Sequence, residues 1–307
     1  MTNNPILRVF GSPYLLLSLG ILFWSGNFVV GRWANLDVPP IALSFWRHTF
    51  AFLIVAPFMI PLLKNDWPAV RSNLGNIAIM GALLATGNTL VYYAIMYTTV
   101  TNAALINAGV PVATVGFSWL ILRDVISRRQ AIGIFLAFSG IVFVVTKAQL
   151  GILLSLEFGL GDLFMLLSVL SWSLYMVMLK RAQIKASPWT ILVVLTISGT
   201  FWLTPAYGIE LALGYRMQWT SLTFASLAYV SFFSTIVSWA CVNYGTMRLG
   251  PNRASAFMCL HPVFGAILGM IFFNEVLRSY HIVGTLLVLI GIFLVSRAMA
   301  AAQSVKS

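Results

Sequence analysis

Long apolar runs, each of a length that crosses a lipid bilayer, take up most of this chain. A helix needs about 20 apolar residues to span a hydrocarbon core of about 30 Å. The runs are continuously apolar, without the alternation typical of barrel strands, and a helix bonds its own backbone in lipid. We therefore expect an all-α integral membrane protein with ten transmembrane helices. Turn formers and most charges lie in the breaks between the runs, such as 64–68 and 250–252. The runs lie near residues 13–32, 39–62, 74–97, 101–122, 129–147, 160–180, 189–210, 222–246, 254–273 and 279–297.

The charge content agrees with this interpretation. Only 8% of the 307 residues are charged, whereas soluble domains have about 25%. The net charge of +11 would suit nucleic acid in a soluble protein. In a membrane protein, excess Lys and Arg in the cytoplasmic loops accounts for it. The partner that the composition predicts is therefore the lipid bilayer, and no nucleic acid.

The distribution of basic residues predicts the orientation. With the N-terminus inside the cell, 13 Lys and Arg fall on the inner side and 5 on the outer side. This bias predicts cytoplasmic N- and C-termini. Arg8 precedes the first run, but no small-x-small cleavage site follows that run. We interpret it as a retained first span rather than a signal peptide.

The second half of the chain repeats the first. Residues 93–144 align with 244–295 at a constant offset of 151, and eleven of the 52 aligned positions are identical. A composition this skewed gives roughly four or five identities by chance. The matched pairs include Pro111 with Pro262, and acidic Asp124 stands opposite Glu275.

The early spans repeat at a different offset, 148, where Trp24 meets Trp172 and Arg32 meets Lys180. The change in offset indicates a short insertion or deletion between the second and third spans. Each half then has five spans, and an odd number makes the second half enter from the opposite side. Inverted repeats are typical of secondary transporters, with the substrate site near mid-membrane. Channels can also be built in this way.

Four short patterns recur in the order of the two halves. They are the first-span segment 23–32, Pro39-Pro40 with Phe45-Trp46-Arg47, Asp124-Val125 with Gly133 and Gly140, and Glu275-Val276 with Gly284 and Gly291. Together they resemble the EamA family of the drug/metabolite transporter superfamily, although Asp124 stands where Glu is usual. The resemblance covers about 13–297 and implies two EamA-type units, at 13–147 and 160–297. It also implies alternating access and export of amino acids or related metabolites across a bacterial inner membrane.

Ionisable residues within spans are candidate site residues, because each costs about 2.5–3.5 kcal/mol at a helix centre. Arg47 lies about two turns into the second span, where it could bind a substrate carboxylate, form an internal ion pair or snorkel to the interface. His261, next to Pro262, could bind substrate, carry a proton or bond to a neighbouring helix. His48 is a weaker candidate for either role.

Polar and aromatic side chains at helical spacing recur in both halves. Residues three or four apart share one helix face. We expect these faces to line a substrate pocket that suits an amino acid head group and an apolar body. Ordinary packing with interhelical hydrogen bonds is the alternative. The residues are Trp24 with Asn27, Trp172 with Tyr175, Asn88 with Tyr92, Trp239 with Asn243, and Asn107 alone.

Several chemistries have no support in the sequence. None of the seven acids falls at the centre of a span, so proton coupling would have to use His48, His261 or Asp162, and facilitated diffusion is an alternative. Neither a phosphate-binding GxxxxGK[ST] loop nor HExxH occurs, and Cys241 and Cys259 lack metal-ligand spacing. We therefore expect no cofactor, no metal and no catalytic residue.

We thus predict a secondary transporter that exports small metabolites, with amino acids, aromatic or large and apolar, ahead of others. One alternative is a facilitator of other metabolites or xenobiotics. Another is a channel-like or structural membrane subunit. A membrane enzyme acting on lipid would need a clustered nucleophile, metal or acid set, which the sequence does not offer. Nothing in the sequence indicates the oligomeric state.

Overall fold

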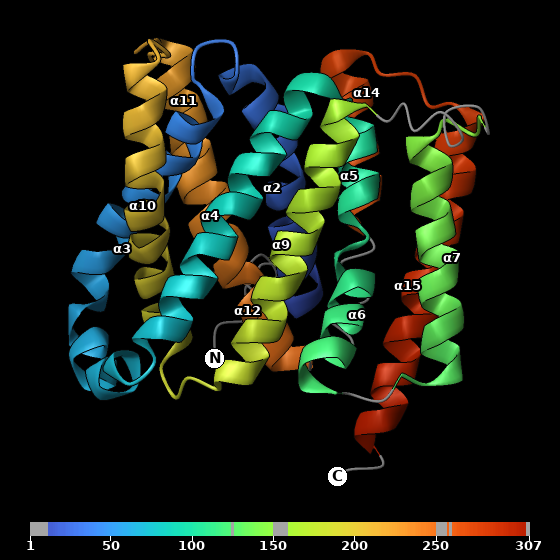
Figure 1. The fold of residues 1–307 in the computed structure, drawn as a ribbon, viewed down its shortest axis with the longest axis horizontal. Helices are drawn as coiled ribbons and strands as arrows, with labels where there is room; N and C mark the ends of the chain where they lie inside the picture. Colours follow the sequence, from blue (N-terminus) through green and yellow to red (C-terminus); the bar gives the residue numbers. More distant parts are fainter. Residues whose placement is uncertain (1–11, 124–125, 150–158, 250–256, 258–259, 305–307) are drawn as a thin grey trace, which may run out of the picture.

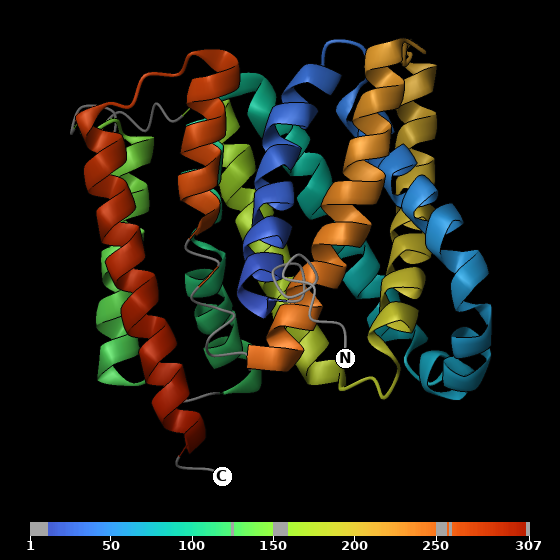
Figure 2. The same ribbon diagram turned by 180° about the vertical axis from the view of Figure 1, so that it is seen from behind.

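The protein is a bundle of helices that run between the same two ends of the molecule (Figures 1 and 2). The computed structural model describes residues 12–123, 126–149, 159–249, 257 and 260–304. Eight helical segments in this part of the chain are long and apolar enough to cross a membrane, and 260–273 and 279–294 are shorter apolar helices. The predicted all-α membrane fold with about ten spanning helices is confirmed.

The first half contributes six helices to the described structure. Pro13 and Pro40 are the first residues of two of these helices. A backbone N–H at that position has no partner inside the helix, so a proline, which lacks the N–H, is tolerated there. A capping box at Ser127 and Gln130 begins another. The helices are α2 (Pro13–Ala34), α3 (Pro40–Arg71), α4 (Leu74–Tyr97), α5 (Val100–Asn107), α6 (Val110–Leu122) and α7 (Arg128–Val145).

The second half follows the same order. α9 runs from the upper end of Figure 1 to the lower end, opposite to α2. α10 begins at Pro188, 148 residues after the start of α3 at Pro40, and α15 begins at Ser279, 151 residues after the start of α7 at Arg128. The elements are α9 (Leu160–Ala182), α10 (Pro188–Ala212), α11 (Ser221–Ala228), the π-helix η1 (Tyr229–Val237), α12 (Ser238–Leu249), α14 (Leu260–Phe273) and α15 (Ser279–Ser304).

Two expected boundaries differ from the structure. α3 continues to Arg71, through the break expected at 64–68, and contains Pro57, Pro61 and Pro68. The fourth span is instead broken, because the chain leaves the helix at Ala108–Gly109 between α5 and α6. A proline at the start of α6 has no N–H to continue the ladder. The expected break at 250–252 and the start of the ninth span at 254 lie outside the described residues.

Acidic side chains hold helix ends together across the bundle. Oδ2 of Asp66, near the end of α3, accepts hydrogen bonds from Ser187 N and Thr190 Oγ1 at the start of α10. In the opposite sense, Glu210 near the end of α10 accepts from Ile41 N and Ala42 N at the start of α3. Each helix therefore caps the other, and these reciprocal bonds fix the register of α3, which carries Arg47.

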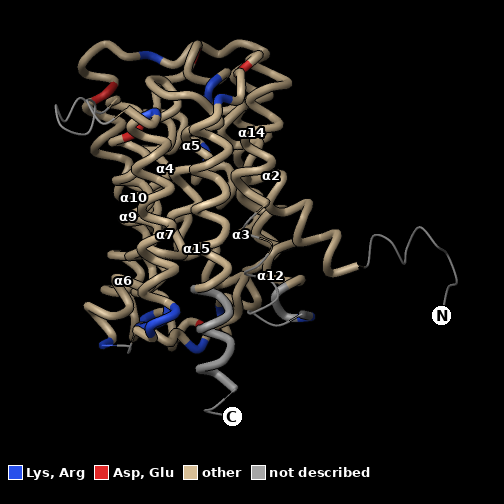
Figure 3. The backbone as a smooth tube through the Cα atoms, turned by 90° about the vertical axis from the view of Figure 1, so that its right-hand side faces the viewer, with Lys and Arg blue, Asp and Glu red and all other residues tan. Residues whose placement is uncertain are grey.

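Charged residues are concentrated at the two ends of the bundle (Figure 3). By helix direction, the end that holds the start of α2 has ten described Lys and Arg against one described acid, whereas the other end has four of each. The middle of the bundle presents apolar side chains such as Phe58, Phe138 and Phe201 to its surroundings. This pattern fits a chain that crosses a bilayer many times.

Candidate functional site

Arg47 lies at the meeting point of α2, α3, α4 and η1, and only 5% of it is exposed. Its Nε donates to Thr235 Oγ1 at 2.8 Å. Its Nη1 donates to Asn27 Oδ1 at 3.1 Å and to Tyr92 OH at 3.0 Å, and the tyrosine hydroxyl donates in turn to Asn27 Oδ1 at 3.0 Å. Of the predicted site residues, the structure thus brings Asn27, Arg47 and Tyr92 into one hydrogen-bonded cluster.

These bonds leave part of the guanidinium unused. A guanidinium has five N–H donors, and the three hydrogen bonds of Arg47 occupy Nε and Nη1. The Nη2 group makes no hydrogen bond to a described residue, and neither does the Nδ2 amide group of Asn27. The cluster therefore contains two donor groups, Arg47 Nη2 and Asn27 Nδ2, that no described residue uses.

The Arg47 charge has no protein counter-ion within the described chain. All three of its partners are neutral oxygens, and a guanidinium stays protonated in proteins. The described acids are engaged elsewhere, near the helix ends; Asp124 and Glu157 lie outside the described residues. Asp37 accepts from Thr220, Asp66 from Ser187 and Thr190, Asp162 from Thr98, Glu210 from Ile41 and Ala42, and Glu275 from Arg32, Val100 and Thr101.

Thr235 is the member of the cluster that the sequence reasoning missed. An uncharged threonine in an apolar run gives no signal by itself. It lies on η1, a nine-residue π-helix, and π-helical turns occur frequently at functional sites.

His261 and Asn88 are two further predicted residues with unused hydrogen-bonding capacity. His261 is 8% exposed, lies edge-on to Phe28 at 5.3 Å between ring centroids, and its buried Nδ1 has no partner among the described residues. Ser25 Oγ also donates to the backbone oxygen of His261. Since Ser25 and Phe28 lie roughly 100–160° from Asn27 around α2, His261 and Arg47 contact different faces of that helix. Asn88 is buried on the same face of α4 as Tyr92, and its side chain makes no hydrogen bond to a described residue.

The other predicted residues lie in different surroundings. Trp172 packs edge-on against Tyr175 at 5.7 Å, in an apolar cluster with Met80 and Leu195. Trp24 is half-buried on α2, and Asn107 is half-buried at the break between α5 and α6.

Trp239 and Asn243 lie on one face of α12, as predicted, but their contacts are with residues outside the Arg47 cluster. Trp239 contacts Trp189 with ring centroids 5.3 Å apart, in an apolar cluster of α3, α10 and η1. The amide of Asn243 donates to the backbone oxygen of Trp239 in its own helix. The expected polar–aromatic pair is therefore present in the second half without a bond to the Arg47 cluster.

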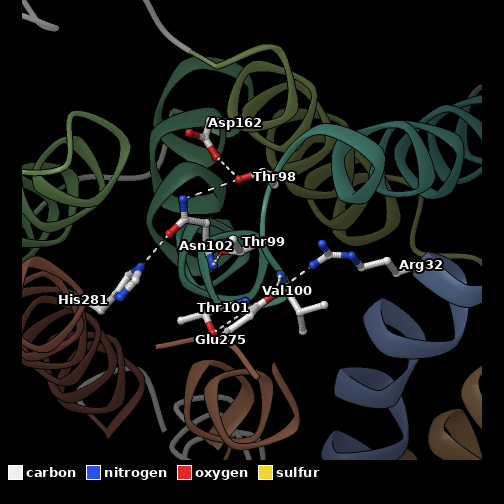
Figure 4. A network of polar contacts seen from close by, with 9 residues as sticks. All are labelled: Arg32, Thr98, Thr99, Val100, Thr101, Asn102, Asp162, Glu275 and His281. Carbon is white, nitrogen blue, oxygen red and sulfur yellow. Dashed lines mark hydrogen bonds and ion pairs between the residues drawn. The ribbon is translucent and has the colours of Figure 1, made fainter. Parts of the chain in front are cut away.

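A second polar network closes one end of the bundle (Figure 4). Oε1 of Glu275 accepts from Arg32 Nη1 at 2.8 Å and from Val100 N at 2.9 Å, and its Oε2 accepts from the backbone and side chain of Thr101. A carboxylate at the N-terminus of α5 is favourable because the helix dipole is positive there. The guanidinium of Arg32 also lies over the ring of Phe273 at 4.5 Å. This network joins α2 and α5 of the first half to the loop before α15.

His281 and Asp162 extend the network across the same end. Arg278 N donates to Nδ1 of His281, which leaves Nε2 to donate to Asn102 Oδ1 at 2.9 Å. Thr98 links Asn102 to Asp162, because its hydroxyl donates to Asp162 Oδ1 at 2.6 Å and accepts from the Asn102 amide. Asp162 is therefore a structural acceptor here, in the first turn of α9.

A crevice of about 370 Å³ lies elsewhere, at the upper end of α10. Tyr207, Leu211, Arg216, Met217 and Trp219 line it. None of the predicted site residues borders this crevice, and its interfacial aromatic and basic side chains are typical of a membrane boundary. The buried Arg47 cluster is therefore the stronger candidate for a substrate site.

Comparison with known proteins identifies related sequences over the whole length of the bundle. The EamA-like transporter family matches residues 11–146 and 159–297. An "uncharacterized transporter" of Archaeoglobus fulgidus is 24% identical over 286 residues, which are 92% of this chain and 96% of the relative. A protein of Rickettsia prowazekii called "S-adenosylmethionine uptake transporter" is 22% identical, and the aligned region covers 83% of this chain and 86% of that protein. A solved structure described as "crystal structure of protein" superposes with a TM-score of 0.61 at 16% identity, over 96% of this chain and 99% of that one, and so shares the fold.

Proposed function

Because this chain belongs to the EamA-like transporter family and is a multi-pass membrane transporter of small molecules, we propose that it carries amino acids out of the cell. The single observation that supports this substrate class is the buried Arg47, whose partners are all neutral and whose Nη2 is unused. A substrate carboxylate would supply the missing counter-charge. Carboxylates are the usual acceptors for a guanidinium, and such charge-assisted bonds are strong.

The arrangement also suits the rest of an amino acid. The unused amide group of Asn27 can donate to the second carboxylate oxygen. The Nδ1 atom of His261, buried without a partner, can accept from a substrate ammonium when the ring is neutral. Tyr92 and Phe28 are buried aromatic neighbours of these groups, which favours aromatic or large apolar side chains.

Alternating access is the proposed mechanism, with two inverted five-helix units at 13–147 and 160–297. The helix starts at constant offsets of 148 and 151 residues support this division. In such folds the two units rock about a central site. The proposed location is a bacterial inner membrane with both termini in the cytoplasm, which the excess of Lys and Arg at the end that holds the start of α2 supports.

Counterflow in proteoliposomes tests the proposal. Liposomes are preloaded with a mixture of unlabelled amino acids, and uptake of labelled ones is followed with and without a pH gradient. Saturable uptake that requires internal substrate is the expected result, and a channel would show no such requirement. Indifference to the pH gradient would favour a facilitator over a proton antiporter. Failure to take up any amino acid would overturn the substrate class and lead to nucleosides, sugars or xenobiotics.

A further inference from the structure

The second-half counterpart of α4 contains a π-helical segment that α4 lacks. α11 begins at Ser221, 147 residues after α4 begins at Leu74, whereas Tyr244 aligns with Tyr93 at an offset of 151. The extra residues therefore lie inside this span and not in the loop before it. η1 occupies nine residues of that stretch. A turn closed by i→i+5 bonds takes up one more residue than an α-turn, so η1 accounts for about two of the extra residues.

The π-turn is visible in the hydrogen bond of Thr235. Its hydroxyl donates to the oxygen of Val230, five residues back, at 2.7 Å. Threonines in the α-helices donate four residues back, as Thr89 does to Ala85 and Thr200 to Thr196. Because the proton of Thr235 is held by Val230, the lone pairs of its oxygen point elsewhere, and one accepts from Arg47 Nε at 2.8 Å.

We propose that Thr235 is a positioning residue that orients Arg47 for substrate, and that the π-helical insertion in this span is what places it there. Thr235 holds the guanidinium at Nε from the η1 side, and Asn27 and Tyr92 hold it at Nη1 from the α2 and α4 sides. Because the guanidinium is planar and rigid, these three hydrogen bonds fix the direction in which Nη2 points. Thr235 then acts on the substrate only through Arg47, and this inference rests on the proposed function.

The aligned first-half helix α4 is α-helical throughout, so the insertion makes the site asymmetric. An α-helical turn at 229–237 would rotate Thr235 relative to α3 and leave Nε without its acceptor. A buried donor of a charged group without an acceptor is costly. The orientation of the Arg47 guanidinium therefore depends on the π-helical geometry of η1.

The test uses three variants of the full chain. Thr235→Val keeps the shape and removes the hydroxyl, and Thr235→Ser keeps the hydroxyl. Thr196→Val is the control, because Thr196 is a buried threonine, where Thr235 is half-buried, and its hydroxyl bonds only to carbonyls of its own helix, those of Leu192 and Val193. Protein labelled with 15N-arginine reports the Arg47 Nε–H directly, with its resonance assigned through Arg47→Lys.

In the first measurement, Thr235→Val is expected to make the Arg47 Nε–H exchange with solvent faster, whereas Thr235→Ser and Thr196→Val keep the wild-type rate. In counterflow, Thr235→Val is expected to raise the KM for the transported amino acid about tenfold or more, as for one lost hydrogen bond to a charged group, with little change in the maximal rate. Thr235→Ser is expected to restore the wild-type KM.

Two results would overturn the inference: unchanged exchange of the Arg47 Nε–H in Thr235→Val, or equal impairment of the Val and Ser variants. A rise in KM as large in Thr196→Val would do the same. If wild-type protein takes up no amino acid while exchange responds as expected, the proposed substrate is wrong and the positioning role of Thr235 stands.

Discussion

At the residue scale, the main feature is a buried cation whose counter-ion is absent from the described chain. Burying a charge costs free energy unless it is paired and hydrogen-bonded. The three bonds of Arg47 meet the second requirement, and its partners do not supply a negative charge. A site of this kind holds a ligand of opposite charge more strongly than a neutral one, because only the anion removes the remaining cost.

Substitution of Arg47 by Lys tests this role. Lysine keeps the charge, but its single ammonium cannot reach Thr235, Asn27 and Tyr92 at once and still present a free donor. We expect amino acid counterflow to fall at least about tenfold while the protein remains folded. Arg71→Lys is the matched control, because Arg71 is exposed at the end of α3. Wild-type transport by the Arg47 variant would refute the assigned role.

The Glu275 network gives a second prediction at this scale. Glu275→Gln removes the charge that caps α5 and pairs with Arg32, whereas Arg32→Gln removes the ion pair and the contact with the Phe273 ring and leaves the cap in place. We expect the Glu275 variant to lose about 1–2 kcal/mol of stability. The Arg32 variant should lose less, because its side chain is 36% exposed and such pairs contribute little. Thermal unfolding in detergent measures both, and equal losses would show that the cap of α5 does not matter.

Sequence reasoning found part of this site. Asn27, Arg47 and Tyr92 stood out because polar groups are rare and costly within apolar runs. Thr235 did not, since its importance comes from a π-turn, and the change of repeat offset was assigned to a loop. Trp172 and Trp239 have the same spacing signal as Asn27, yet they pack in separate apolar clusters, because spacing defines a helix face and not its neighbours.

At the element scale, glycines set how closely α7 and α15 approach. A Cβ on Gly140 would lie 2.7 Å from the backbone oxygen of Gly284, and one on Gly291 would lie 2.5 Å from that of Gly133. Backbone atoms cannot move aside as a flexible side chain can. These glycines therefore allow α7 and α15 to pack closely.

Alanine substitution tests this contact. Gly140→Ala is expected to destabilise the protein by about 1–3 kcal/mol, the usual range for overpacking. Gly116→Ala is the matched control, since a Cβ at Gly116 meets no atom within 4 Å, and this change should be neutral or slightly stabilising. Thermal unfolding of the two variants provides the comparison, and an unaffected Gly140 variant would mean that the helices can separate without loss.

The starts of elements were more predictable than their ends. Pro40, Ser127 and Pro188 mark helix starts by their backbone chemistry. The predicted end of the second span was wrong. The polar segment 64–68 was interpreted as a break, whereas it belongs to the mostly exposed last part of α3. Where a membrane helix passes into water, composition changes although the backbone does not.

At the scale of the whole molecule, the charge distribution predicts the orientation. Lys185 lies between α9 and α10 at the basic end, and Tyr215 lies between α10 and α11 at the opposite end; both are exposed. In a background with Cys241 and Cys259 replaced, Tyr215→Cys should react with a membrane-impermeant maleimide in intact cells. Lys185→Cys should react only after permeabilisation, and the reverse pattern would invert the proposed topology.

The most direct test of the account compares a transported amino acid with its primary amide as competitors in counterflow. The two molecules have nearly the same shape, and the amide lacks the negative charge that Arg47 is proposed to bind. We predict that the amino acid suppresses labelled uptake by the wild-type protein and that the amide at ten times the concentration does not. Equal competition by the amide would contradict the account, because recognition would then not depend on the carboxylate.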